Sequence, residues 1–318
     1  MKHARLLPLL ALLPLLLLAQ PAEEIRLLAR DPGGHGLLCQ TRGKSVLILA
    51  GTPEEMGRAH GTLMRNGVRG VSQRTMYLVG AGYTVSKNDW FFERMDEVLE
   101  RTRPHTPERF LREIDAMAAA AGITTRDGRV TNFFPEMFHC SGFAVRGSAT
   151  KDGGILHARV LDYMRDIRLQ DFACVQLFLP GDPAHHAWMS LGYTGFVGTV
   201  TAMNEKGLAI GEMGGKGEGQ WDGMPMSLLM RDIMERAATV EEAIAIFRDT
   251  PRTCEYYCVV SDRQRHMAGL YCTPEKVEVL EPGAQHELLP HVPPDTVLIS
   301  GGGRRSEEHT SELQSPNT

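Results

Sequence analysis

The stretch PEMFHCSGFAV (135–145) marks the place where the sequence changes from a helical pattern to a strand pattern. Before it, residues 106–121 repeat their apolar side chains at helical spacing, and a glycine follows them as a helix end. After it, apolar residues alternate with a period of two, which is typical of half-buried strands. Cys140 stands at this boundary, followed by the small pair Ser141 and Gly142.

Downstream of Cys140, the pattern predicts strands interrupted by one pair of helices. Upstream, residues 23–139 are predicted to be mainly helical. Helices in one part and antiparallel strands in another indicate an α+β fold in layers. The predicted strands are 142–146, 154–160, 173–179, 197–203, 207–213, 256–261 and 266–272, and the predicted helices are 53–66, 106–121, 225–238 and 239–249.

Both ends of the chain are expected to lie outside the folded domain. Residues 1–22 combine basic Lys2 and Arg5 with a short Leu-rich run, a pattern typical of a secretory signal. We therefore expect a secreted or periplasmic protein. Residues 304–318 end in RSEEHTSELQSPNT, which resembles a translated sequencing-library adapter, so we expect the natural C-terminus to be missing.

Composition and missing motifs exclude several classes of protein. The 34 basic and 39 acidic residues give a net charge of −5, which argues against nucleic acid as a partner. After residue 22 no apolar run is long enough to span a membrane. The chain has no HExxH motif and no paired CxxC motif, so neither a metal nor a cofactor is expected. Six cysteines permit disulfides, such as Cys254–Cys258 or Cys258–Cys272, without fixing their pairing.

Arg159 and Asp162 follow Cys140 in the sequence at a spacing that could bring them close to it in the fold. A turn at Asp152-Gly153 would return residues 154–160 beside 142–146, and so bring Arg159 close to Cys140. An arginine beside a thiol lowers the thiol pKa and favours the nucleophilic thiolate. Asp162 joins the same site only if the strand bends, because Arg159 and Asp162 would face opposite sides of a regular strand.

This spacing leaves two interpretations open. In the first, cleavage between His139 and Cys140 frees an α-amine with a pKa of roughly 7.7–8, which serves as the general base for the thiol. No catalytic histidine is then needed. In the second, Cys140 is a buried residue at a strand edge, and Arg159 and Asp162 form a surface ion pair.

Four motifs in order resemble one known family. They are GTPEEMGRAHG (51–61), PEMFHCSGFAV (135–145), ATKDGGILHARVLDY (149–163) and MNEKGLAI (203–210). Together they resemble the acyl-CoA:6-aminopenicillanic acid acyltransferase-like family of N-terminal-nucleophile hydrolases, over residues 45–303. The resemblance implies a four-layer αββα sandwich, incomplete at its C-terminus. It also implies that 23–139 is a helical pro-segment or light chain and that 140–303 is the hydrolase core.

The resemblance also implies roles for individual residues. Cys140 would be the nucleophile, freed by self-cleavage after His139, and Arg159 and Asp162 would orient its thiol and amine. Asn204 would donate to an oxyanion, although Asn-Glu-Lys-Gly is also a good hairpin turn. The aromatic residues expected to line an acyl pocket, or else to belong to the core, are Tyr163, Trp188 and Tyr193.

Two features depart from the family pattern. His139 stands where family members often carry a small residue, and its bulk would slow the self-cleavage step. The family also places a second asparagine in strands near the C-terminus. After Asn204 this chain has only Asn317, inside the adapter-like tail.

The sequence therefore predicts an exported, self-cleaving cysteine amidohydrolase or acyltransferase that acts on linear amides through an acyl-thioester. Its partners would be a small acyl-amide substrate and the light and heavy chains of one precursor. One alternative is an ester or lipid deacylase on the same scaffold, similar to phospholipase-B-like proteins. Another is a secreted binding domain without catalysis, which would have little use for Arg159 and Asp162 beside Cys140.

Overall fold

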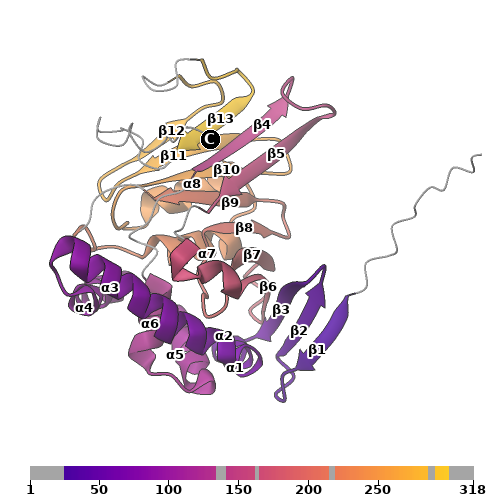
Figure 1. Cartoon of the computed structure of the whole chain (residues 1–318). Helices are drawn as coiled ribbons and strands as arrows, with labels where there is room; N and C mark the ends of the chain where they lie inside the picture. The colour runs from indigo at the N-terminus through magenta and orange to yellow at the C-terminus, as the bar shows by residue number, and fades with distance from the viewer. Residues whose placement is uncertain (1–24, 134–140, 162–164, 215–218, 286–290, 301–318) are drawn as a thin grey trace, which may run out of the picture.

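The computed structural model describes residues 25–133, 141–161, 165–214, 219–285 and 291–300 (Figure 1). The predictions that concern residues 1–24, 134–140, 162–164 and 301–318 lie outside these ranges. The described residues form one sheet of ten strands, one sheet of three strands, and helices packed against the larger sheet. The chain is therefore a mixed α+β structure, as the sequence predicts.

The larger sheet runs in the order β1-β2-β3-β6-β7-β8-β9-β10-β11-β12. Neighbours pair antiparallel except β3 and β6, which pair in parallel. Its strands are β1 (Arg26–Arg30), β2 (Gly36–Thr41), β3 (Lys44–Gly51), β6 (Ala173–Pro180), β7 (Trp188–Tyr193), β8 (Thr201–Asn204), β9 (Ala209–Gly214), β10 (Tyr256–Ser261), β11 (Met267–Cys272) and β12 (Val277–Leu280).

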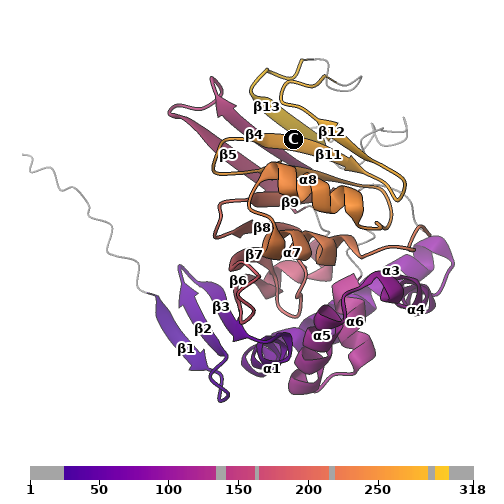
Figure 2. The ribbon, with the colours of Figure 1, turned by 180° about the vertical axis from the view of Figure 1, so that it is seen from behind.

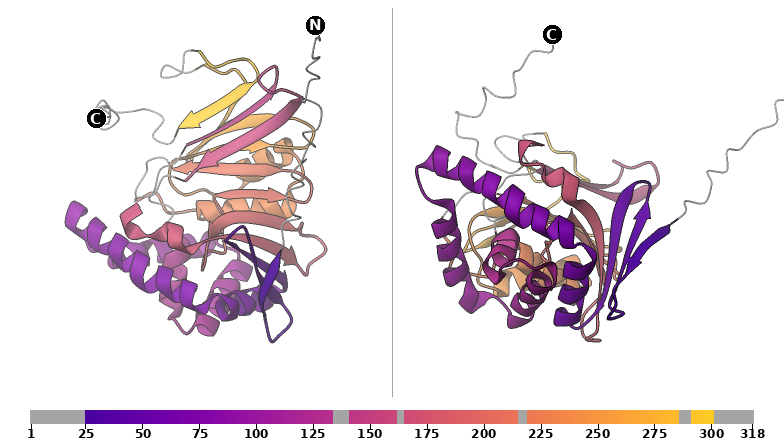
Figure 3. Two further views of the ribbon diagram at one scale, coloured as in Figure 1. Left: turned by 45° about the vertical axis from the view of Figure 1, so that its right-hand side comes forward. Right: turned by 60° about the horizontal axis from the view of Figure 1, so that its bottom comes forward.

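The segment 23–139, predicted to be mainly helical, begins with three strands that were not predicted. Residues 26–51 form β1–β3, which stand at one end of the large sheet (Figure 3). Arg42 and Gly43 both have positive φ, at 47° and 71°, which suits a two-residue hairpin turn. Leu47 and Leu49 alternate into the core, a strand signal that the helical interpretation missed. The N-terminal segment thus shares a sheet with the later strands.

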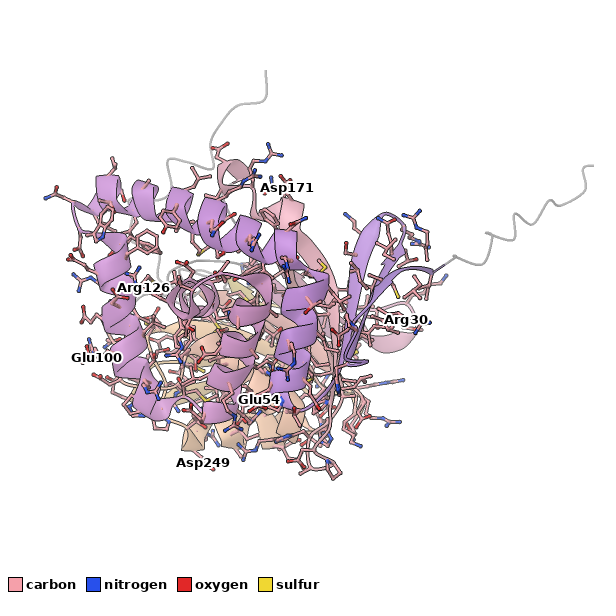
Figure 4. The ribbon with its side chains drawn as sticks, turned by 90° about the horizontal axis from the view of Figure 1, so that it is seen from below. Arg30, Glu54, Glu100, Arg126, Asp171 and Asp249 are labelled. Atoms are coloured by element: carbon pink, nitrogen blue, oxygen red, sulfur yellow. The ribbon has the colours of Figure 1, made fainter. Side chains whose placement is uncertain are left out.

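The remaining N-terminal residues are helical, as predicted. The helix predicted over 106–121 begins at Glu108, with Pro107 as its N-cap, and the Thr106 hydroxyl donates to the Thr102 carbonyl. Charged side chains such as Glu100 and Arg126 lie on the outer side of this helical group (Figure 4). Its helices are α1 (Pro53–Leu63), α2 (Arg65–Gly70), the π-helical turn η1 (Val71–Thr75), α3 (Met76–Lys87), α4 (Phe91–Thr102), the 3-10 turn η2 (Arg103–His105), α5 (Glu108–Ala121) and α6 (Thr125–Phe133).

Two further helices, α7 (Met226–Arg236) and α8 (Val240–Asp249), pack on one face of the large sheet (Figure 2). On the opposite face lies the small sheet, in the order β13-β4-β5. Its strands are β4 (Ser141–Gly147), β5 (Gly153–Val160) and β13 (Thr296–Ser300). Two short 3-10 turns, η4 (Arg165–Ile167) and η5 (Leu169–Phe172), lead into β6.

An apolar cluster joins the two sheets. It contains Ala144 and Val297 from the small sheet and Met213 and Val259 from the large one. The order of layers is therefore helix, large sheet, small sheet. Of the four layers expected, the described residues form these three, and the outer face of the small sheet carries exposed Phe143, Leu156 and Leu298.

Most predicted strands are confirmed, with one shift that matters for the site. The strand expected over 197–203 begins only at Thr201, because residues 194–200 form an irregular buried loop. The strands β7, β12 and β13 were not predicted. None of the helices that the structure describes is long and apolar enough to cross a membrane.

Candidate active site

The hairpin of β4 and β5 places Arg159 beside the start of β4, as predicted. Ser141 pairs with Val160, and Gly142 pairs with Arg159. Cys140 directly precedes Ser141 in the chain and, like His139, Asp162 and Tyr163, lies outside the described residues. The register therefore brings Arg159 to the end of β4 that directly follows Cys140 in the sequence.

Arg159 points into the space between the two sheets and binds Glu212 on β9. Its Nε donates to the Glu212 carbonyl oxygen at 2.8 Å, and Nη2 lies 3.3 Å from Glu212 Oε2. The two side chains are only 2% and 4% exposed. A buried guanidinium needs such a partner, since an isolated buried charge is strongly unfavourable.

Gly211 makes room for this arginine. A Cβ at position 211 would lie 3.0 Å from Arg159 Cγ and 3.1 Å from Arg159 Cβ. The stem of Arg159 thus crosses β9 over a residue without a side chain. A side chain at 211 would therefore require the stem of Arg159 to shift.

Sequence reasoning missed Glu212. The carboxylate expected near Arg159 was Asp162, which lies outside the described residues; among the described residues, Glu212 binds Arg159. The signal was a single acidic residue inside an otherwise apolar strand, AIGEMG (209–214). An acid in such a place is almost never left buried without a partner, so it pointed to a buried cation.

The cysteines that the structure describes are buried and none of them is in a disulfide, so neither disulfide considered from the sequence forms. Burial raises the pKa of Cys174 and Cys272 to about 12. The pKa of Cys258, opposite Glu212 on β10, is raised well above its usual value, mainly by burial, while Arg159 opposes the shift. These thiols stay protonated at neutral pH and make poor nucleophiles.

His157 lies two residues before Arg159 on the same face of β5. Its Nδ1 is 2.9 Å from the Ser261 hydroxyl on β10. Burial lowers the pKa of His157 to about 4, so the ring is neutral at physiological pH. It bridges the two sheets without adding a second positive charge beside Arg159.

Asn204 has a structural role rather than the expected oxyanion role. Its Nδ2 donates to the carbonyls of Met234 and Ala237 at the end of α7, at 2.9 and 2.7 Å. Its Oδ1 accepts from the backbone N–H groups of Lys206 and Leu208. Both amide hydrogens are thus used inside the fold, and none remains for an oxyanion. The hairpin-turn interpretation of Asn204 is the one the structure supports.

Trp188 and Tyr193 belong to the core rather than to an acyl pocket. Trp188 stacks on Phe178 with ring centroids 4.3 Å apart, and Tyr193 stacks on Phe196 at 4.7 Å. Their exposures are 3% and 2%, on the helical side of the large sheet. They are therefore not on the side of that sheet where Arg159 lies.

Known proteins resemble this chain at low identity. Protein dcd1B and protein dcd1A of Dictyostelium discoideum are each 25% identical, over 71% and 69% of this chain and 49% and 56% of their own lengths. An uncharacterized protein of Archaeoglobus fulgidus is 24% identical over 76% of this chain and 45% of its own. The chain spans about half the length of the curated relatives it matches.

Solved structures that match part of this chain include a Caenorhabditis elegans ortholog of N-acylethanolamine-hydrolyzing acid amidase. The match covers 52% of this chain and 71% of the amidase, with a TM-score of 0.39 and 16% identity. For a mutant of conjugated bile acid hydrolase from Clostridium perfringens, the match covers 53% of this chain and 54% of the hydrolase, with a TM-score of 0.34 and 16% identity.

A family model matches the part of the chain that contains Arg159 and Glu212. The match covers residues 151–287. It includes β5 and β9, which form the buried pair, and two of the four motifs fall largely or wholly within it. Residues 151–287 thus match the acyl-coenzyme A:6-aminopenicillanic acid acyl-transferase family, which confirms the resemblance predicted from the motifs.

Proposed function

We propose that the protein is an exported cysteine amidohydrolase or acyltransferase, activated by self-cleavage between His139 and Cys140. The observation that carries this proposal is the buried Arg159–Glu212 pair beside the start of β4. The Arg159 side chain is only 2% exposed, and its partner in the register, Gly142, lies two residues after Cys140 in the sequence. Burying a cation in this way lowers the stability of the fold, so stability alone does not explain the pair. It is well suited to favouring a thiolate.

In the proposed first step, the Cys140 thiol gives its proton to the α-amine of the same residue. The thiolate sulfur attacks the amide carbonyl carbon, the carbon–nitrogen bond breaks, and the departing amine takes the proton from the α-ammonium group. The product is an acyl-thioester on Cys140. Arg159 stabilises the thiolate before the attack.

In the proposed second step, water or an acceptor amine attacks the thioester carbonyl. The α-amine takes the proton of the attacking group, and the carbon–sulfur bond breaks. The proton then returns to the sulfur, so the site is restored. Water as acceptor makes the protein a hydrolase, and an amine makes it an acyltransferase. The substrate class is a small linear amide of a carboxylic acid.

The test is the turnover of fluorogenic amides that join fatty acyl groups to aminocoumarin. We expect Arg159→Gln to lower kcat/KM by about 100-fold or more, because the thiolate loses its cation. Arg146→Gln is the matched control, since Arg146 is a partly exposed arginine on neighbouring β4 that binds the Arg265 carbonyl. Equal activity of Arg159→Gln and Arg146→Gln, or no turnover by the wild type, would refute the proposal.

A further inference from the structure

The loop of residues 194–200, between β7 and β8, is irregular and yet buried along its whole length. Buried backbone groups outside helices and strands must find partners elsewhere. Two N-terminal helices supply several of them. The loop therefore depends on side chains that come from a part of the chain more than sixty residues away.

His60 on α1 and Asn132 on α6 hold the first half of this loop. The Gly195 N–H donates to His60 Nε2 at 3.0 Å. Asn132 Nδ2 donates to the Gly195 carbonyl at 3.0 Å, and the Val197 N–H donates to Asn132 Oδ1 at 2.8 Å. These hydrogen bonds fix the loop backbone on both sides of a glycine with φ of +87°.

Two glycines of the GTPEEMGRAHG motif explain how His60 reaches this place. A Cβ at Gly57 would lie 2.2 Å from the Glu113 carbonyl oxygen, and one at Gly61 would lie 2.2 Å from the Met117 carbonyl oxygen. Helix α1 therefore packs backbone to backbone on α5, which sets its position. His60, 0% exposed, then points at Gly195. Burial lowers the pKa of His60 to about 3, so Nε2 keeps the lone pair that accepts this bond.

The second half of the loop ends on the residue that holds Arg159. The Thr199 N–H donates to the Ser227 carbonyl at 3.0 Å, and the Glu212 N–H donates to the Val200 carbonyl at 2.9 Å. Glu212 in turn accepts from Arg159 through its backbone and its carboxylate. A continuous set of hydrogen bonds and covalent links therefore joins His60 to the guanidinium.

We propose that His60 and Asn132 are positioning residues, which hold loop 194–200 against Glu212 and so fix the guanidinium of Arg159. This inference rests on the proposed function, because it assumes that Arg159 acts on Cys140. The inference gives a role to His60, the histidine of the 51–61 motif, which takes no part in the proposed reaction. Both residues bind the backbone of the loop rather than Arg159 itself.

The experiment measures the rate of Cys140 alkylation by iodoacetamide against pH, with peptide mapping to separate Cys140 from the buried thiols. Only the thiolate reacts, so the midpoint reports the pKa that Arg159 sets. In His60→Leu the acceptor is lost, and we expect about a tenfold lower rate at pH 6. His60→Gln should restore the wild-type profile, because its Oε1 can occupy the place of Nε2. His60→Asn is too short to do so.

Phe91→Leu is the control for lost stability. Phe91 is fully buried in α4 and is not one of the residues that bind the loop in the hydrogen bonds described above. The substitution should lower the melting temperature and leave the alkylation profile unchanged. If His60→Leu does not fold, the comparison of His60→Asn with His60→Gln replaces it.

The outcomes separate this inference from the proposed function. A wild-type midpoint near roughly 8.5, the value of a free cysteine, would contradict the proposed function itself. A low wild-type midpoint that stays unchanged in His60→Leu and His60→Asn would overturn only the positioning role. A shift of equal size in Phe91→Leu would also overturn it, because the effect would then follow stability.

Discussion

At the scale of single residues, the site depends on the charge pair of Arg159 and Glu212, which is buried between the two sheets. Arg159 follows from its distance to Cys140 and from the hairpin turn between them. Glu212 lies 53 residues further along, and only the packing of β5 over β9 brings it to Arg159. For Asn204, the motif predicted an oxyanion role that the structure does not support. A motif match could not reveal that the carbonyls of Met234 and Ala237, at the end of α7, accept both amide hydrogens of Asn204.

Breaking this pair should cost stability as well as activity. Glu212→Gln keeps the shape of the side chain and removes the negative charge that Arg159 faces. We expect the free energy of unfolding in urea to fall by about 3 kcal/mol. Glu278→Gln is the control, since Glu278 forms an exposed ion pair with Lys276, worth about 0–1 kcal/mol. Equal stabilities of the two variants would contradict a buried pair.

Two buried histidines predict a loss of stability in acid. The pKa of His60 is lowered to about 3 and that of His157 to about 4, both by burial. The unfolded chain binds these protons near pH 6.5 and the folded one does not, so stability is full above about pH 6.5 and falls below it. At pH 5 each histidine should lower the free energy of unfolding by about 2 kcal/mol relative to its value at neutral pH.

Urea unfolding at pH 7 and pH 5 checks this dependence. His60→Gln has no proton to gain in this range and should show a smaller drop between the two pH values than the wild type. An identical drop in both proteins would show that His60 is not held neutral in the folded state.

At the scale of elements, regular alternation could be predicted and irregular packing could not. The β4–β5 hairpin and helices α5, α7 and α8 follow from local pattern and turn residues. Strands β1–β3 were missed because neighbouring helical signals dominated the interpretation of 23–139. Loop 194–200 was missed because its apolar residues imitate a strand, while its partners come from α1, α6 and α7.

The packing of α1 on α5 gives a prediction at this scale. Gly57→Ala places a methyl group where the Glu113 carbonyl oxygen lies, so the helices must separate, and we expect a clear fall in melting temperature. Gly82→Ala in α3 is the matched control, because no atom lies within 4 Å of its Cβ position. It should raise the free energy of unfolding by about 0.5–1 kcal/mol. A Gly57→Ala protein as stable as Gly82→Ala would contradict the close contact.

At the scale of the whole molecule, the segments before and after Cys140 form one core. Phe110 and Phe133 from the N-terminal helices pack in the same buried cluster as Phe178 and Phe196, and β3 pairs with β6. A light chain ending at His139 would therefore stay bound to the heavy chain after cleavage. The sequence predicts two segments with a boundary at Cys140. It did not predict that they share one sheet, because the strands at 26–51 that join this sheet were not recognised.

Intact mass analysis of the purified protein, under native and then denaturing conditions, tests the central claim most directly. We predict one particle under native conditions that separates in denaturant into two chains, the heavier beginning at Cys140. Cys140→Ala should remain a single chain. A wild-type protein that stays a single chain, or that is cut at another bond, would contradict the account.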